Sequence, residues 1–143
     1  GQTYKVAGVT HYQDAIRAMG VENDDYRLTA RELAEMDMTD VNIYQYEFYP
    51  LKVELVPEPD NQYDPNAIKV MVDGAHVGYI KAGSCAHLLK VIKEGRIKAI
   101  DASIGGGKFK YLSIDDYDEN GDPICALEKD ETPFFVHLNI TEV

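Results

Sequence analysis

The residue types best suited to chemistry gather in one turn-rich segment, residues 60–66, which reads Asp-Asn-Gln-Tyr-Asp-Pro-Asn. Tyr63 carries an aromatic face on which a nucleic-acid base could stack, an interaction worth roughly 1–3 kcal/mol that tolerates any base. The carboxylate of Asp64 can accept a hydrogen bond from a hydroxyl group but repels a phosphate. Asp and Asn also form turns through their own side chains, and Pro65 fixes a backbone angle that turns use. The segment predicts either a stacking site with a hydroxyl acceptor or a purely structural turn.

Metal-binding patterns are weaker. Only Cys85 and His87 are close in sequence among the possible zinc ligands, and no CxxC or HxxxH spacing occurs. The segment 116–121 resembles the first half of a calcium loop, but the twelfth position is Leu127 rather than Glu. We expect no metal site, with zinc as the open alternative. The possible zinc ligands are His11, His76, His87, His137, Cys85 and Cys125.

Signatures of catalysis are also incomplete. The glycine-rich run 105–108 has Ala102 where a phosphate-binding P-loop needs its first glycine and Phe109 where it needs Ser or Thr. No Ser-His-Asp or Cys-His order stands out, and paired carboxylates cannot be chosen among 25 acidic residues. We therefore expect a chain that is not an enzyme and holds no cofactor.

Acidic charge is concentrated toward the C-terminal end of the sequence. The formal net charge is −11, yet residues 51–112 carry nine basic and seven acidic residues, whereas residues 113–143 carry one basic and nine acidic residues. This overall acidity argues against broad duplex binding, because such binding is mostly phosphate neutralisation. It leaves room for a small nucleic-acid site with a few cations.

The size and composition suit one globular domain. The 143 residues are 45% hydrophobic and 27% charged, which is ordinary for a folded protein with a single core. No apolar run approaches the roughly 18–20 residues of a membrane span, and no signal-peptide pattern occurs at the start. Two cysteines cannot form a disulfide framework. We expect a single domain, residues 1–143, located in the cytoplasm and without membrane partners.

Local patterns at the start of the chain predict a strand followed by helices. Residues 4–9 alternate and are rich in β-forming types, which predicts a strand. Thr29 and Glu32 form a capping box that opens a helix reaching about residue 36. Together with a short helix over residues 13–19, this makes the segment 13–40 an expected helical insertion after the first strand.

The rest of the chain alternates strand patterns with turn signals. Asp73-Gly74 predicts a hairpin turn, and Ser84 and Gly95 are placed to begin and end a helix. The three glycines 105–107 are expected to form a turn, and residues 115–123 an acidic loop. The expected strands cover residues 43–48, 51–57, 67–72, 76–80, 96–104, 108–114, 124–127 and 134–140.

Many short strands with two or three short helices indicate a mainly β (α+β) chain, and the number and spacing of the strands favour a small β-barrel. Gly78 is expected to mark a bulge or a close approach between backbones. The expected core includes Ala67, Ile68, Val70, Val77 and Ile80.

Three motifs lie close together in the middle of the chain. They are Glu58-Pro59, the run 61–68 with the sequence Asn-Gln-Tyr-Asp-Pro-Asn-Ala-Ile, and Val77-Gly78-Tyr79. This pattern resembles the HIRAN domain, a module found at the N-terminus of some Swi/Snf-type helicases and as stand-alone bacterial proteins. The segment 5–9 also fits the first strand of that family.

The resemblance implies an OB-like or SH3-like β-barrel that binds single-stranded DNA at a free 3′ end, with a role in DNA repair. In the family, the tyrosine at the position of Tyr63 stacks on the terminal base. The aspartate at the position of Asp64 accepts a hydrogen bond from the 3′ hydroxyl, and Asn61 lies in the same pocket. Lys81, which follows the Val-Gly-Tyr strand, matches a cation that contacts phosphates.

The first strand departs from the helicase-linked family members, which carry Arg-Tyr-Tyr there. In this chain the aligned residues are Tyr4-Lys5-Val6. Lys5 could contact a phosphate, and Tyr4 could stack only if the register shifts by one residue. Lys108 or Lys110 could supply a further phosphate contact.

Two other classes of function remain open. The insertion 13–40 or the acidic C-terminal segment could bind a protein partner of basic charge, which would make the chain an interaction module. A metal-dependent hydrolase would need two or more carboxylates converging on a metal, and the sequence offers acids without a spaced ligand motif.

Overall fold

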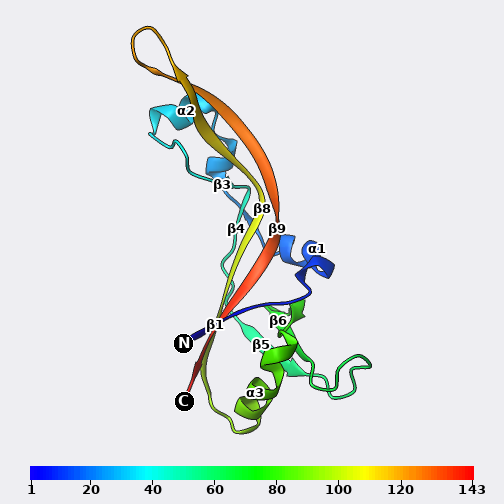
Figure 1. The fold of residues 1–143 in the computed structure, drawn as a ribbon. Helices are drawn as coiled ribbons and strands as arrows, with labels where there is room; N and C mark the ends of the chain where they lie inside the picture. Colours follow the sequence, from blue (N-terminus) through cyan, green and yellow to red (C-terminus); the bar gives the residue numbers. More distant parts are fainter. The chain divides into compact units, whose positions relative to one another are not determined.

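The computed structural model describes residues 1–143, and strands are its most abundant secondary structure (Figure 1). The predicted mainly β (α+β) class with a few short helices is confirmed. The α-helices are α1 (Gln13–Arg17), α2 (Ala30–Glu35) and α3 (Ala82–Lys93), and the 3-10 helices are η1 (Val9–His11) and η2 (Asp24–Arg27). The strands are β1 (Gln2–Lys5), β2 (Val21–Glu22), β3 (Ile43–Tyr44), β4 (Tyr46–Glu47), β5 (Val53–Pro57), β6 (Ile68–Val72), β7 (Ala75–Tyr79), β8 (Ile97–Tyr117) and β9 (Pro123–Glu142). No helix is both long and apolar enough to cross a membrane.

The strands form three antiparallel sheets, with the orders β1-β9-β8-β3, β5-β6-β7 and β2-β4. An isolated bridge between Ala7 and Tyr79 joins the end of β1 to β7. The expected barrel is not closed, because β5 and β3 each pair with only one neighbouring strand and remain edges. Four residues of β1 pair with β9, with Tyr4 opposite Leu138 and Lys5 opposite His137.

The chain divides into two compact units. Unit 1 comprises residues 1–20, 48–105 and 133–143, and unit 2 comprises residues 21–47 and 106–132. The long strands β8 and β9 contribute to both units. Each unit is described separately below.

The three glycines of β8 do not form the predicted turn, because the strand continues through them. Gly106 and Gly107 have φ angles of 93° and 87°, a region that residues with side chains rarely adopt. A Cβ atom on Gly105 would lie 2.6 Å from the ring of Phe135. The glycines therefore bend a continuous strand and make space for an aromatic ring.

Unit 1 is held together by buried residues on β6, β7 and α3. On β6 the side chains alternate, so Ile68, Val70 and Val72 are fully buried, as the period of a strand requires. The helix α3 buries Leu88 and Val91 from one face. It begins at Ala82 after Lys81, so the prediction that Ser84 caps it is wrong. The predicted core residues are all buried, namely Ala67, Ile68, Val70, Val77 and Ile80.

Gly78 lets the segment just after β1 approach β7 closely. A Cβ atom there would lie 2.4 Å from the carbonyl oxygen of Ala7 and 2.6 Å from Cγ1 of Val6. This absence of a side chain allows Ala7 and Tyr79 to exchange backbone hydrogen bonds of 2.8 and 2.9 Å. The ladder to β6 also shifts register beside Val70, the partner of Gly78. The predicted bulge and close approach are both confirmed, and together they position Tyr79.

Unit 2 has a small core of Leu33, Ile43 and Leu112. The predicted capping box is confirmed, because Thr29 Oγ1 accepts from the backbone of Glu32 and the Glu32 carboxylate accepts from the backbone of Thr29. This box fixes the start of α2, which buries Leu33.

The predicted acidic loop 115–123 is shorter in the structure. Strand β8 runs to Tyr117 and β9 begins at Pro123. Asp118 Oδ1 accepts from the backbone of Asn120 and Asp122, both at 2.9 Å. Asp118 therefore organises the turn, together with Gly121, which has a positive φ.

Candidate functional site

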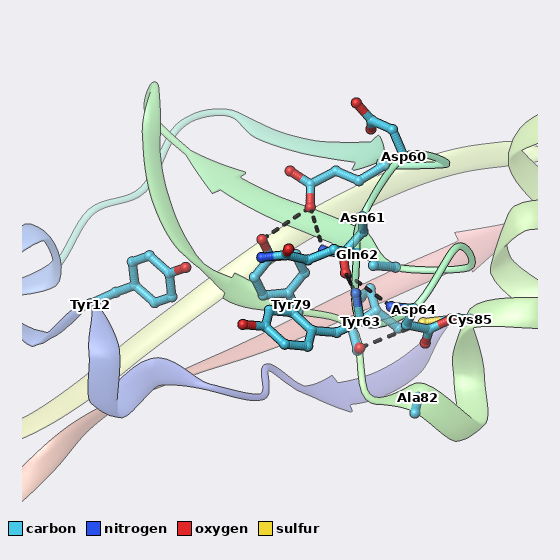
Figure 2. Close-up of a pocket in the computed structure, with 12 residues that line it drawn as sticks. Tyr12, Asp60, Asn61, Gln62, Tyr63, Asp64, Tyr79, Ala82 and Cys85 are labelled. Carbon is cyan, nitrogen blue, oxygen red and sulfur yellow. Dashed lines mark hydrogen bonds between the residues drawn. The ribbon is translucent and has the colours of Figure 1, made fainter.

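A hollow of about 790 Å³ opens beside the loop between β5 and β6 in unit 1 (Figure 2). Its volume is within the roughly 300–1,000 Å³ of small-ligand pockets. The lining comes from this loop, the end of β7, the start of α3 and the residue before α1. The lining residues are Tyr12, Glu58, Asp60, Asn61, Gln62, Tyr63, Asp64, Ala67, Tyr79, Ile80, Ala82 and Cys85.

Side-chain-to-backbone hydrogen bonds fix the loop. Asn61 Oδ1 accepts from the backbone of Tyr63 at 2.9 Å and of Asp64 at 3.0 Å. Asp64 Oδ1 accepts from the backbone of Asn66 at 2.8 Å. These are the Asx-type turns that the sequence predicts. The turn engages only Oδ1 of Asp64, so Oδ2 of Asp64 makes no hydrogen bond.

Tyr63 contributes a solvent-exposed aromatic ring to this pocket. Its side chain lines the hollow and yet is 89% exposed. An exposed ring gains little from burial, so the face of Tyr63 is available for a planar ligand to stack on.

Glu58 is held in one orientation. Its Oε1 accepts from Asn61 Nδ2 at 3.1 Å and from the Tyr79 hydroxyl at 3.0 Å. Two hydrogen bonds lower the pKa of Glu58, and the one from Asn61 has a larger effect than the one from Tyr79. Burial has the largest effect on Tyr79 and the hydrogen bond to Glu58 the next largest, and they raise the pKa of Tyr79 to about 12. At neutral pH the carboxylate is therefore ionised and the tyrosine is a neutral donor.

Three aromatic rings pack together beside the pocket, and two of them, those of Tyr12 and Tyr79, belong to residues that line it. The ring of His76 lies 4.1 Å from that of Tyr12 and 4.9 Å from that of Tyr79, measured between centroids. His76 Nε2 lies 3.0 Å from the carbonyl oxygen of Gly78. Burial lowers the pKa of His76, so the ring is neutral at pH 7 and packs as an aromatic group between the two tyrosines.

The lining carries acidic charge without a basic side chain. Glu58, Asp60 and Asp64 contribute carboxylates, and neither Lys nor Arg lines the hollow. Burial, with a smaller contribution from the Asp64 charge, raises the pKa of the Cys85 thiol. The thiol is therefore neutral, and the pocket suits a ligand that offers hydrogen-bond donors rather than a phosphate.

The structure brings together three of the predicted site residues, Asn61, Tyr63 and Asp64. Lys81 is exposed and lies in the chain between two lining residues, Ile80 and Ala82. Its backbone therefore lies at the margin of the pocket.

The other predicted contacts lie elsewhere. Tyr4 is only 8% exposed, which leaves its ring little surface for stacking, and Lys5 is exposed on β1 but does not line the pocket. Lys108 belongs to unit 2, where it lines a separate hollow with Tyr26. Lys110 is 5% exposed and donates to the carbonyl oxygen of Leu28 at 2.6 Å, so its ammonium group is already engaged.

Sequence reasoning missed Tyr12, Glu58 and Tyr79 as pocket residues. Two of them carried a signal, because Glu58 and Tyr79 belong to the motifs quoted above. Tyr12 carried none, since its place depends on how the segment before α1 packs against His76.

The histidines and cysteines do not gather into a metal site. No group of three or more His, Cys, Asp or Glu side chains is arranged to hold a metal ion. His76 serves as a packed aromatic ring, and Cys85 directs its sulfur toward the carbonyl oxygens of Ile80 and Lys81.

Comparison with known proteins identifies a family for this chain. No curated protein and no solved structure matches the chain significantly. The family model for the HIRAN domain matches residues 3–115 of the 143 residues, a span that contains every residue lining the pocket. The chain belongs to the HIRAN domain family.

Proposed function

We propose that the pocket binds the 3′-terminal nucleotide of a single strand, with DNA as the favoured nucleic acid. HIRAN domains are nucleic-acid-binding modules and generally do not catalyse reactions. One observation supports the proposal that this pocket binds a 3′-terminal nucleotide. Tyr63, whose ring is exposed, and Asp64, which has one oxygen free of hydrogen bonds, line a pocket that has carboxylates and no cation in its lining.

Tyr63 stacks on the terminal base, because every base has an aromatic face and stacking requires no sequence. Tyr12 lines the same hollow from a separate segment of the chain (Figure 2). It supplies a second aromatic surface in place of Tyr4, whose ring is buried.

Asp64 recognises the end of the strand. Its Oδ2 accepts a hydrogen bond from the free 3′ hydroxyl, whereas a terminal or internal phosphate would be repelled by the carboxylates. Asn61 positions Asp64 through the bond from the Asp64 backbone. The same interaction therefore fixes the loop and orients the acceptor.

Phosphates of the preceding nucleotides lie outside the acidic lining in this proposal. Lys81 is the nearest candidate cation along the chain, since both of its neighbours line the pocket. Lys5 is exposed and remains a proposed contact for phosphates farther from the terminus. Lys108 is also exposed and remains a proposed phosphate contact within unit 2.

The proposal is tested by fluorescence anisotropy with a labelled ten-nucleotide strand that carries a free 3′ hydroxyl. The variant Tyr63→Ala should bind at least fivefold more weakly, since stacking is worth roughly 1–3 kcal/mol per base. The control Tyr117→Ala removes a tyrosine that is also exposed but belongs to unit 2. Equal affinity for the wild type and Tyr63→Ala would contradict the stacking role.

Protein binding is the second candidate function. At the end of the β8–β9 pair, Ile114, Tyr117 and Ile124 are exposed apolar residues within a segment that carries nine acids and one base over residues 113–143. Exposed apolar groups among acidic residues suit a basic partner. If folded protein binds none of the test strands, this candidate replaces the first.

A further inference from the structure

We propose that Glu58 selects the terminal base at this pocket and favours guanine over thymine. This inference rests on the binding of a terminal nucleotide proposed above. It adds a preference for one base, which stacking on Tyr63 and hydroxyl recognition by Asp64 do not provide.

Glu58 lines the pocket, and one of its two carboxylate oxygens is free of hydrogen bonds. Oε1 is engaged by Asn61 and Tyr79, while Oε2 makes no hydrogen bond within the protein. Glu58 lines the hollow and is partly buried. Because the two bonds to Oε1 fix the side chain, Oε2 is held in place before a ligand arrives and loses little freedom on binding.

Nothing else in the lining offers a charged donor that would neutralise Glu58. The remaining charged side chains of the hollow are those of Asp60 and Asp64. The cation Lys69 acts on Glu58 only through its charge, and its effect is smaller than those of the two hydrogen bonds. Oε2 of Glu58 can therefore accept a hydrogen bond that the ligand donates.

Bases differ in the donors along their pairing edges. Guanine presents its N1–H and N2 amino group side by side, and a carboxylate oxygen with two lone pairs can accept from both. Adenine and cytosine each offer one amino group beside a ring nitrogen that is an acceptor. Thymine offers one N–H between two carbonyl oxygens, which the carboxylate repels. The expected order is guanine first, adenine and cytosine next, and thymine last.

The test uses four labelled ten-nucleotide strands, each with nine thymidines followed by dG, dA, dC or dT and a free 3′ hydroxyl. Fluorescence anisotropy on the intact chain should show about tenfold tighter binding of the dG-ended strand than of the dT-ended strand, as a charged hydrogen bond provides. The variant Glu58→Gln should bring this ratio close to one while the dT-ended strand still binds, because the amide oxygen can accept from Asn61 and Tyr79.

The matched control is Glu54→Gln, which removes an exposed carboxylate from β5 that pairs only with Lys52 and does not line the pocket. It should keep the full preference for dG. A strand ending in deoxyinosine adds a test on the wild-type protein, because inosine lacks the N2 amino group of guanine. It should bind several times more weakly than the dG-ended strand.

The outcomes separate this inference from the proposed function. Equal binding of all four strands by the wild type, an unchanged ratio in Glu58→Gln, or deoxyinosine equal to guanine would each overturn the role of Glu58 and leave 3′-end binding intact. Failure of every strand to bind would overturn the proposed function itself.

Discussion

At the scale of single residues, Asp64 combines a structural and a proposed binding role. Its Oδ1 accepts from the backbone of Asn66 and closes a turn, which requires an oxygen but no charge. Its proposed role toward a terminal hydroxyl and against a phosphate requires the charged carboxylate. A substitution that retains the oxygen and removes the charge can therefore separate the two roles.

The variant Asp64→Asn makes that separation. We expect its free energy of unfolding to change by less than about 0.5 kcal/mol, because Asn forms the same turn. We expect its preference for a 3′ hydroxyl over a 3′ phosphate to fall at least fivefold, since the repulsive charge is lost. Urea unfolding and anisotropy measure the two effects. A stable variant that keeps the full preference would remove Asp64 from its assigned role.

Glu58 and Tyr79 predict a pH dependence of stability. The pKa of Glu58 is lowered from 4.5, first by Asn61 and then by Tyr79, so the ionised form is favoured in the folded state. That stabilisation is present above the unfolded pKa and is lost as pH falls through the lower folded pKa. Between about pH 5 and pH 3, wild-type stability should therefore fall more steeply than that of Tyr79→Phe.

NMR titration of the carboxyl chemical shifts measures directly how the Tyr79 hydroxyl affects the pKa of Glu58. The pKa of Glu58 should lie below 4.5 in the wild type and rise in Tyr79→Phe. Glu54, in the strand β5 that precedes Glu58, serves as an internal reference. An identical pKa for Glu58 in both proteins would show that the Tyr79 hydroxyl does not hold the carboxylate.

At the scale of elements, the approach of the segment just after β1 to β7 at Gly78 positions the pocket. Replacing Gly78 with alanine places a Cβ atom 2.4 Å from the carbonyl oxygen of Ala7, and φ there is 152°. We expect Gly78→Ala to lower the free energy of unfolding by about 1–3 kcal/mol, as overpacking does, and to weaken binding because Tyr79 is displaced.

Gly83→Ala is the control for that substitution, because a Cβ atom on Gly83 in α3 would have nothing within 4 Å. It should leave stability unchanged or raise it by up to about 1 kcal/mol. Chemical denaturation of both variants checks the pair. Equal stability of Gly78→Ala and the wild type would contradict the close approach.

Elements defined by local chemistry were predictable from the sequence. The capping box at Thr29 and Glu32 and the turn at Asp73-Gly74 depend on neighbouring residues only, and both are found. The turn predicted at the glycines of β8 was wrong because a positive φ is compatible with both a turn and a bent strand. The packing of Phe135 against Gly105 favours the strand. The start of α3 at Ala82 was missed since Ser84 had the better capping side chain.

The site was partly predictable for the same reason. The loop residues Asn61, Tyr63 and Asp64 form one contiguous motif, and they share one pocket. The place of Tyr12 follows from a contact with His76, 64 residues away in sequence, and no local pattern encodes that contact. The burial of Lys110 depends likewise on the carbonyl oxygen of Leu28.

At the scale of the whole molecule, the net charge of −11 limits how much affinity phosphates can provide. Few phosphate contacts give a shallow dependence on salt, with the logarithm of the binding constant changing by about 0.7 per contact for single strands. We expect a total slope of magnitude about 2 or less, compatible with one to three phosphate contacts.

Lys81→Ala should reduce that slope by about 0.7, because the variant removes the candidate cation whose chain neighbours line the pocket. Lys93→Ala, at the opposite end of α3 and also exposed, should leave the slope unchanged. Anisotropy titrations from low to moderate salt measure both. Equal slopes for the two variants would assign the phosphate contact to another residue.

The most direct test of 3′-end binding compares three labelled strands of ten nucleotides at low salt. One carries a free 3′ hydroxyl, one a 3′ phosphate, and one is circular. We predict tight binding of the free hydroxyl strand and at least tenfold weaker binding of the other two, because the pocket is lined by carboxylates and by no cation. Equal binding of all three would contradict end recognition and leave a general single-strand binder.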